Sequence, residues 1–183
     1  MVTDLQSNYS SPAGKEFTLT AGYFAGVNPA SRILDLGCGY GDGACTIANQ
    51  FRCRVEAIDI NPENIDFSRQ LAIERSVSHL ITFQTQDINE ADFSKDPSDL
   101  VLAEGGVLSF INRSNGLKKA ASWLVSRGYF AFSDLVFLSE KTPDEIKNIF
   151  EDKVYHYETE SSYRELIKDA GFDIQLMCLV PQS

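Results

Sequence analysis

The sequence has few cysteines, and their spacing fits neither a metal site nor a disulfide framework. The four cysteines stand at positions 38, 45, 53 and 178, and no two of them form a C-x-x-C pair. This spacing argues against a zinc site and against a disulfide-stapled fold. It favours a reduced, cytoplasmic setting in which most of the thiols are small buried side chains.

Long apolar runs and basic clusters are missing as well. No stretch approaches the ~18 apolar residues of a membrane span, and the opening MVTDLQSNYSSPAGKEF lacks the pattern of a signal peptide. The 16 basic and 26 acidic residues give a formal net charge of −10, with no basic run that could bind nucleic acid. We therefore expect neither a membrane nor a nucleic acid as partner, but a small molecule or another protein.

What the sequence does contain is a regular alternation of strand-like and helix-like segments. Apolar runs rich in β-branched and aromatic residues predict buried parallel strands over residues 32–37, 55–60, 80–87, 99–105 and 128–137. Helices are expected over residues 41–51, 61–76, 114–128 and 158–171. Asn61 is the expected N-cap of the second helix, with Pro62 in its first turn, and Gly128 and Gly171 are expected to end the last two. The 183 residues therefore predict one doubly wound α/β domain.

A glycine-rich stretch follows the first predicted strand. ILDLGCGYGDGACTIA, residues 33–48, places four glycines within seven positions. So many glycines indicate a sharp turn or a ligand that approaches the main chain closely. Ligands of open α/β sheets bind beyond the carboxyl ends of the strands, where the winding reverses, and this loop is expected there.

Asp35 distinguishes between two ligand classes for this loop. Counted from Gly39, the loop reads G-x-G-x-x-A, a variant of the dinucleotide-binding fingerprint. A carboxylate two residues before Gly37 would repel a pyrophosphate in a partly desolvated site, and it favours an ammonium or sulfonium group. A nicotinamide-dependent oxidoreductase is therefore a remote alternative function. For Asp35 itself, the alternative is a purely structural role, as a solvated or helix-capping residue.

The stretch ILDLGCGYGDGACTIA resembles motif I of the class I S-adenosylmethionine-dependent methyltransferases, in which D-x-G-x-G-x-G follows an apolar strand. VEAIDINPENID is similar to the second motif of that family, FQTQDI to the third, DLVLAEGGVLSF to the fourth and LVSRGYFAFSD to the fifth. YRELIKDAGFDI resembles the helix-to-strand ending, and residues 11–39 resemble the N-terminal helix of the small-molecule, UbiE-like branch. The resemblance thus covers essentially the whole chain in the family's order.

The resemblance implies a three-layer Rossmann-like sheet of order 3-2-1-4-5-(7)-6. It also implies S-adenosyl-L-methionine as cofactor, S-adenosyl-L-homocysteine as product and a small-molecule methyl acceptor. The cofactor-binding residues that it implies are Asp35, Gly37, Cys38, Gly39, Tyr40, Asp59, Ile60, Asp87, Ile88 and Glu104. Asp59 would bind the ribose hydroxyls, and Asp87 would accept a hydrogen bond from the adenine amino group beside Ile88.

In methyl transfer, the main task of the protein is to align the reactants, because the sulfonium already activates the methyl group. Glu104, at the end of the fourth strand, is the candidate catalytic base. Alternatively, it contacts the cofactor or has only a structural role. Tyr23 and His156 are weaker candidates for substrate contact. The alternative for Tyr23 is a position in the hydrophobic core. His156 lies in the polar segment 138–158, an expected excursion or lid, whereas His79 precedes the third strand and is expected at the surface.

The end of the sequence departs from the family pattern. Relatives with a similar AEGG segment continue through another helix and a final antiparallel strand, whereas this sequence stops at DIQLMCLVPQS. We therefore expect a single domain over residues 1–183 that is incomplete at its C-terminus, with the final strand missing. A protein or fragment that binds the cofactor without transferring methyl is the alternative function. The sequence indicates neither the acceptor atom nor the oligomeric state.

Overall fold

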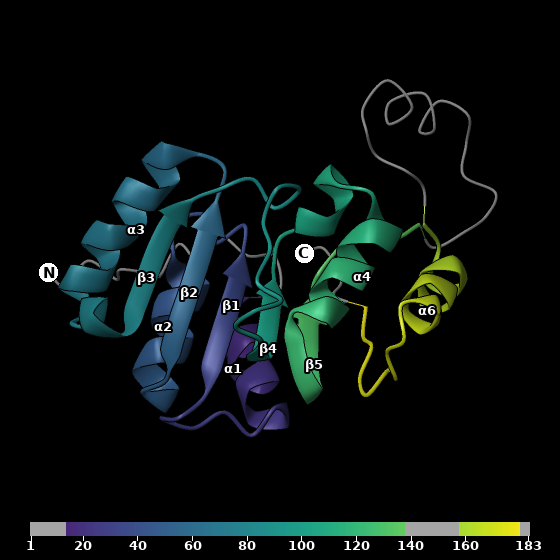
Figure 1. The fold of residues 1–183 in the computed structure, drawn as a ribbon, viewed down its shortest axis with the longest axis horizontal. Coiled ribbons are helices and arrows are strands. Elements are labelled where there is room, and N and C mark those ends of the chain that lie inside the picture. The colour runs from purple at the N-terminus through teal and green to yellow at the C-terminus, as the bar shows by residue number, and fades with distance from the viewer. Residues whose placement is uncertain (1–13, 138–157, 180–183) are drawn as a thin grey trace, which may run out of the picture.

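The computed structural model describes residues 14–137 and 158–179. Its strands form one parallel sheet in the order β3-β2-β1-β4-β5 (Figure 1). They are β1 (Arg32–Leu36), β2 (Arg54–Asp59), β3 (Ile81–Thr85), β4 (Ser98–Ala103) and β5 (Leu124–Phe132). The predicted α/β class and the predicted order of these five strands are confirmed. The winding reverses between β1 and β4, where Asp35 lies level with Leu102.

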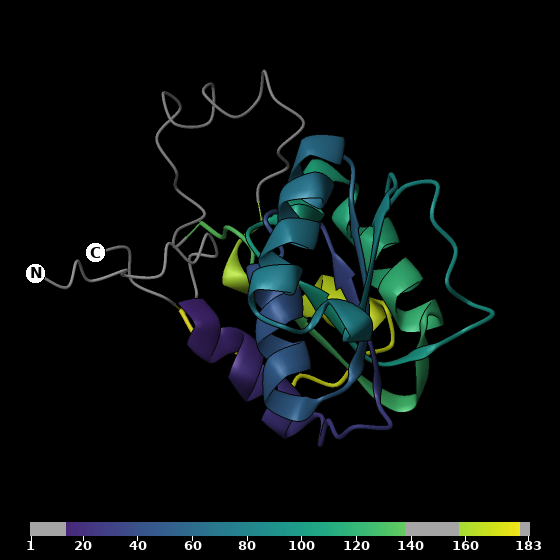
Figure 2. The same ribbon diagram turned by 90° about the vertical axis from the view of Figure 1, so that its left-hand side faces the viewer.

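Helices cover both faces of the sheet. They are α1 (Gly14–Phe24), α2 (Asp42–Phe51), α3 (Pro62–Glu74), α4 (Arg113–Ser122) and α6 (Glu160–Asp169), with the short 3₁₀ helices η1 (Ser78–Leu80) and η2 (Val107–Phe110). Figure 2 shows α1, α2 and α3 on one side of the sheet and α4 on the other. Within the described ranges, no helix combines the length and the apolar character that crossing a membrane requires.

The central strands β1 and β4 are mostly apolar because both of their faces are covered. One face of the sheet, covered by α1, α2 and α3 (Figure 2), includes the side chains of Ile33, Val55 and Leu100. The opposite face includes those of the neighbouring residues Leu34 and Val101. Successive side chains of a strand point to opposite faces, so each strand must supply apolar residues to two cores. This double burial explains the apolar runs of the central strands, whereas the edge strand β3 has exposed polar residues.

The helix ends follow the predicted caps in two places. The Asn61 side chain caps α3 by accepting a hydrogen bond from the Glu63 N–H at 3.0 Å, with Pro62 in the first turn. Gly171 follows α6 with φ of +89°, and its N–H donates to the Lys168 carbonyl. Both features agree with the roles expected from the sequence.

The boundary between α4 and β5 differs from the prediction. The helix expected over residues 114–128 ends at Ser122, and Gly128 lies inside β5 rather than at a helix end. The strand begins with a bulge, since Ser98 pairs with Leu124 but the next paired residue, Leu100, faces Tyr129. Trp123, between helix and strand, is buried against the sheet, and its packing ends the helix early.

The region after β5 brings two distant parts of the chain together. Phe137 and Thr159 form an isolated parallel bridge, and the Phe137 N–H donates to the Glu158 carbonyl at 2.8 Å. This bridge places α6 beside β5. The intervening residues, including His156 and nearly all of the expected lid, lie outside the described residues. Residues 172–179 are described and contain no strand, so the expected helix-to-strand ending is not seen there.

Candidate active site

The glycine loop, residues 37–41, joins β1 to α2 at the carboxyl edge of the sheet. Gly37 has φ of +65°, and a Cβ atom there would lie 2.6 Å from the Val107 side chain of η2. Gly39 also has positive φ, at +53°, but no heavy atom lies within 4 Å of the position a Cβ would take. The loop therefore packs tightly at Gly37 and leaves space for a ligand beside the Cα of Gly39.

The peptide groups of Gly39 are held by β2 and α3. Its N–H donates to Asp59 Oδ2 at 2.8 Å, and its carbonyl accepts from the Ser68 hydroxyl at 2.9 Å. Ser68 is fully buried on α3, in the same stripe as Ile65 and Ala72. Ser68 was not among the predicted site residues, although a hydroxyl inside an otherwise apolar helix stripe is a signal that could have revealed it.

Asp59 ends β2 beside the glycine loop, as the motif comparison anticipated. Its Oδ1 accepts from the Asn61 N–H at 2.9 Å and from Asn64 Nδ2 at 3.1 Å. The carboxylate is buried, whereas the next side chain, Ile60, is 68% exposed at the same edge. The structure thus brings an acid and an apolar side chain next to Gly39. Contacts of Asp59 and Ile60 with a nucleoside stay predictions.

Asp35 is a buried carboxylate, only 4% exposed, at the carboxyl end of β1. Burial raises the pKa of this carboxyl well above its ordinary value, and the charges of Glu104 and Asp59 raise it further. A backbone hydrogen bond from Ala44, in the first turn of α2, opposes this rise. In the described part of the chain, the groups that shift the pKa of Asp35 include no cation. A positively charged ligand would relieve this charge accumulation.

Glu104 follows β4 and lies beneath α1. Its Oε1 accepts a hydrogen bond from the hydroxyl of Thr18, which is completely buried on α1. We refer to Asp35 and Glu104 as the acidic pair. Because α1 also packs against α2, the helix covers this side of the acidic pair. Thr18 was not predicted, since its partner is 86 residues away in the sequence.

The loop after β3 also lies at the carboxyl edge of the sheet. The Gln86 N–H donates to the Asp59 carbonyl, which brings the next two residues, Asp87 and Ile88, to this edge. Asp87 Oδ1 accepts from the main chain of Asn89, and Ile88 is half-buried against the α4 side of the sheet. The predicted adenine contacts therefore come from residues on the correct edge, and the contacts themselves stay predictions.

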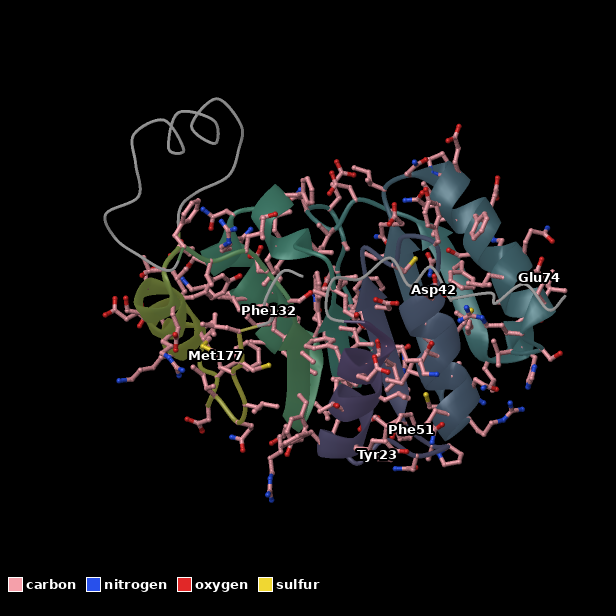
Figure 3. The ribbon with its side chains drawn as sticks, turned by 180° about the vertical axis from the view of Figure 1, so that it is seen from behind. Tyr23, Asp42, Phe51, Glu74, Phe132 and Met177 are labelled. Carbon is pink, nitrogen blue, oxygen red and sulfur yellow. The ribbon has the colours of Figure 1, made fainter. Side chains whose placement is uncertain are left out.

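The remaining predicted residues differ in their placement. Tyr40 is half-exposed in the glycine loop, with its ring 5.0 Å from that of Phe67. Tyr23 lies at the far end of α2 from Asp42, against Phe51 (Figure 3), and accepts a hydrogen bond from Gln50 at 2.9 Å. The Tyr23 side chain is 63% exposed and lies far from the glycine loop. Its position therefore supports neither contact with a substrate nor a place in the core.

Among the described residues, the histidine and the cysteines show no feature of a catalytic group. His79 is exposed in η1, before β3, as expected. Burial raises the pKa of Cys45 and of Cys53 to about 11, and burial together with Asp35 raises that of Cys38. These thiols stay protonated near neutral pH and are poor nucleophiles.

Comparisons with known proteins agree with this geometry. A family model described as "Methyltransferase domain" matches residues 28–171. The sarcosine/dimethylglycine N-methyltransferase of Halorhodospira halochloris is 29% identical over 150 residues, which cover 80% of this chain and 53% of that protein. Phosphoethanolamine N-methyltransferase 1 of Arabidopsis thaliana is 27% identical over 147 residues, which cover 80% of this chain and 29% of that protein. The chain thus spans about half of the first relative and less of the second.

Solved structures show the same fold. The E. coli protein YjhP superposes with a TM-score of 0.79 at 20% identity, covering 93% of this chain and 70% of that one. A methyltransferase from Geobacter sulfurreducens, solved with S-adenosyl-L-homocysteine, gives a TM-score of 0.75 at 20% identity and covers 90% of this chain and 66% of that one. At such identities the similarity concerns the fold of the sheet and its helices.

Proposed function

The chain belongs to the methyltransferase-domain family, and we propose that it transfers a methyl group from S-adenosyl-L-methionine to the nitrogen of a small amine. The observation that carries this proposal is the buried Asp35 carboxyl, whose pKa is raised by burial and by the charges of Glu104 and Asp59, close to the space left open at Gly39. The cofactor has an ammonium and a sulfonium group, and an amine acceptor adds a further cationic group. The names of the two relatives, both N-methyltransferases, support nitrogen as the acceptor atom.

The residues present fit this cofactor. Asp35 would balance its positive charge, and the open space beside Gly39 would admit its amino-acid end. Both Asp59 oxygens already accept hydrogen bonds within the protein, and a remaining lone pair would accept from a ribose hydroxyl. When bound, the cofactor supplies a methyl group that is already electrophilic. The protein must then exclude water and hold the acceptor in line with that methyl group, which accounts for much of the rate enhancement in such reactions.

A nicotinamide cofactor fits less well. Its pyrophosphate would lie near Gly39, where the buried Asp35 and Asp59 would repel it. The methyltransferase-domain match removes the remaining ground for an oxidoreductase.

Glu104 is the group that we propose as the catalytic base. Most amines are protonated in neutral water and must lose a proton before nitrogen can attack. The Glu104 carboxylate is positioned by the Thr18 hydroxyl and faces the same region as Asp35. It would accept that proton directly or through a water molecule.

A non-catalytic cofactor-binding protein is the second candidate function. The observation in its favour is length, because the chain spans 53% of the first relative and 29% of the second. The small-molecule, UbiE-like branch, the cytoplasmic location and a single domain stay predictions.

The test is transfer of labelled methyl from S-adenosyl-L-methionine to sarcosine, dimethylglycine and phosphoethanolamine. We expect at least one of them to be methylated, and Glu104→Gln to lower kcat by about 10²–10⁴-fold while binding of S-adenosyl-L-homocysteine persists. Glu74→Gln, on the exposed end of α3 (Figure 3), is the matched control and should not change kcat. Binding of the cofactor without transfer to any amine would favour the non-catalytic candidate.

A further inference from the structure

Three buried polar side chains form a hydrogen-bonded network close to Gly106, in the turn that follows β4. Arg113 Nε donates to Asp134 Oδ2 at 2.7 Å, and the side chains of this ion pair are 5% and 1% exposed. The Tyr163 hydroxyl donates to the same Asp134 oxygen, also at 2.7 Å. We call these three side chains the buried network; it joins the start of α4, the end of β5 and α6.

The ring of Tyr163 strengthens this arrangement. It stacks on Phe132 with centroids 5.5 Å apart, and the Arg113 guanidinium lies over its face at 5.8 Å. Burial, and then the charge of Asp134, raises the pKa of the Tyr163 hydroxyl, so this group remains a hydrogen-bond donor at any physiological pH. Both Asp134 oxygens accept hydrogen bonds, Oδ1 from the Leu135 N–H at 2.8 Å. The carboxylate is therefore fixed rather than free for a ligand.

Ser133 directly precedes Asp134 in the chain and contacts the turn that follows β4. Its hydroxyl accepts from the Gly105 N–H at 2.8 Å, and its carbonyl accepts from the Gly106 N–H at 2.9 Å. Its own N–H donates to the Ala103 carbonyl at 3.1 Å. Ser133 thus spans the end of β4 and the turn that carries Glu104.

The same turn supports the glycine loop. Gly105 and Gly106 both have φ near +80°, so the chain reverses sharply after Glu104 and leads into Val107. The Val107 side chain occupies the space beside Gly37 where a Cβ atom would lie. A shift of the 104–107 turn would therefore move both Glu104 and the packing surface of the glycine loop.

We propose that Ser133 is a positioning residue for the cofactor site and that the buried network holds Ser133 in place. Together they fix the 104–107 turn against the glycine loop and so set the affinity for the cofactor. This inference rests on the function proposed above. A buried ion pair contributes little net stability compared with apolar packing, and fixing one local geometry is a use to which it is well suited.

The test measures binding of S-adenosyl-L-homocysteine together with amide hydrogen exchange. Ser133→Ala removes the acceptor for Gly105, and Tyr163→Phe removes one donor to Asp134 while it keeps the ring. We expect each variant to weaken binding roughly three- to tenfold, the effect of one lost hydrogen bond. We also expect the amides of Gly105 and Gly106 to exchange faster in both variants.

Two further variants separate positioning from general destabilisation. Ser133→Thr keeps the hydroxyl and should restore wild-type affinity, and Tyr129→Phe removes the hydroxyl of a tyrosine outside the buried network and should change nothing. If Ser133→Ala binds as tightly as wild type, or if threonine fails to rescue it, the inference is wrong and the proposed function stands. If wild-type protein does not bind S-adenosyl-L-homocysteine, the inference and the proposed function are both wrong.

Discussion

Asp35 keeps a carboxylate where water hardly reaches it and where Glu104 and Asp59 add charge of the same sign. Burying such a group is unfavourable unless something compensates it, and Ala44 supplies only one backbone hydrogen bond. The unliganded protein therefore bears a cost at this residue, and a cationic ligand would remove it. Residues that function requires are often unfavourable for stability in this way.

Replacing Asp35 by Asn should separate stability from binding. The variant removes the buried charge, so we expect a higher midpoint of thermal unfolding at pH 8, by about 2–4 °C for each kcal/mol gained. Binding of S-adenosyl-L-homocysteine should weaken at the same time. Differential scanning fluorimetry and calorimetry measure the two effects. Glu74→Gln removes an exposed charge instead and should leave both unchanged.

The difference between Asp35→Asn and wild type should also depend on pH. The pKa of Asp35 in the folded state lies above its ordinary value, so the folded protein holds this proton more tightly than the unfolded chain. The stability contributed by the protonated group is present at low pH and is lost as the pH rises through the folded pKa. The advantage of Asn should thus be larger at pH 8 than at pH 4. An equal advantage at both values would contradict the raised pKa.

The positions of individual site residues were predictable from the sequence where a local motif determines them. They were not predictable where a contact with a distant residue determines them. Asp35 and Asp59 each end a strand in a recognisable motif, and the structure places both beside the glycine loop. Thr18 and Ser133 act through hydrogen bonds to residues 86 and 28 positions away. No local pattern of a single sequence encodes such a pairing.

At the scale of elements, the glycine loop depends on contacts with its neighbours. Gly37→Ala should destabilise the protein by about 1–3 kcal/mol and abolish cofactor binding, because the new methyl group would collide with Val107 at a positive φ. Denaturation in urea measures the loss of stability. Gly26→Ala is the matched control, with φ of +63° and no neighbouring atom within 4 Å. It should lose only about 1 kcal/mol through strain and should bind normally. Equal effects of the two substitutions would show that Val107 does not confine the loop.

Element boundaries were predictable where the chain changes character abruptly. Asn61 and Pro62 mark the start of α3, and the glycine loop marks the end of β1. The segment Trp123–Val125 carries no such signal, because its apolar residues suit a helix and a strand alike. Tertiary packing of Trp123 decides the outcome there, and the bulge of β5 then accommodates Arg127 at φ of +67°.

At the scale of the whole molecule, the sheet order brings together loops that are distant in the sequence. Reversal of the winding between β1 and β4 places the glycine loop next to the 104–107 turn. The alternation of apolar and amphipathic segments predicted the doubly wound class, and the resemblance to the methyltransferase family supplied the strand order. The same alternation predicts that the described layers unfold as one unit.

Trp123 provides a probe for that cooperativity. It is the single tryptophan of the sequence, is 2% exposed and packs edge-on against Phe93 with centroids 5.4 Å apart. We expect its fluorescence and the far-UV circular dichroism to change at the same urea concentration, as they do in a two-state transition. Two separate midpoints would show that the prediction of a single domain is wrong.

The central claim is that Asp35 and the open glycine loop bind a cationic, sulfur-containing nucleoside or its demethylated product. Isothermal titration of the purified protein with S-adenosyl-L-homocysteine, and with NAD in parallel, tests it most directly. We predict saturable heat at one equivalent of S-adenosyl-L-homocysteine and none with NAD. Heat from NAD alone, or from neither compound, would contradict the account.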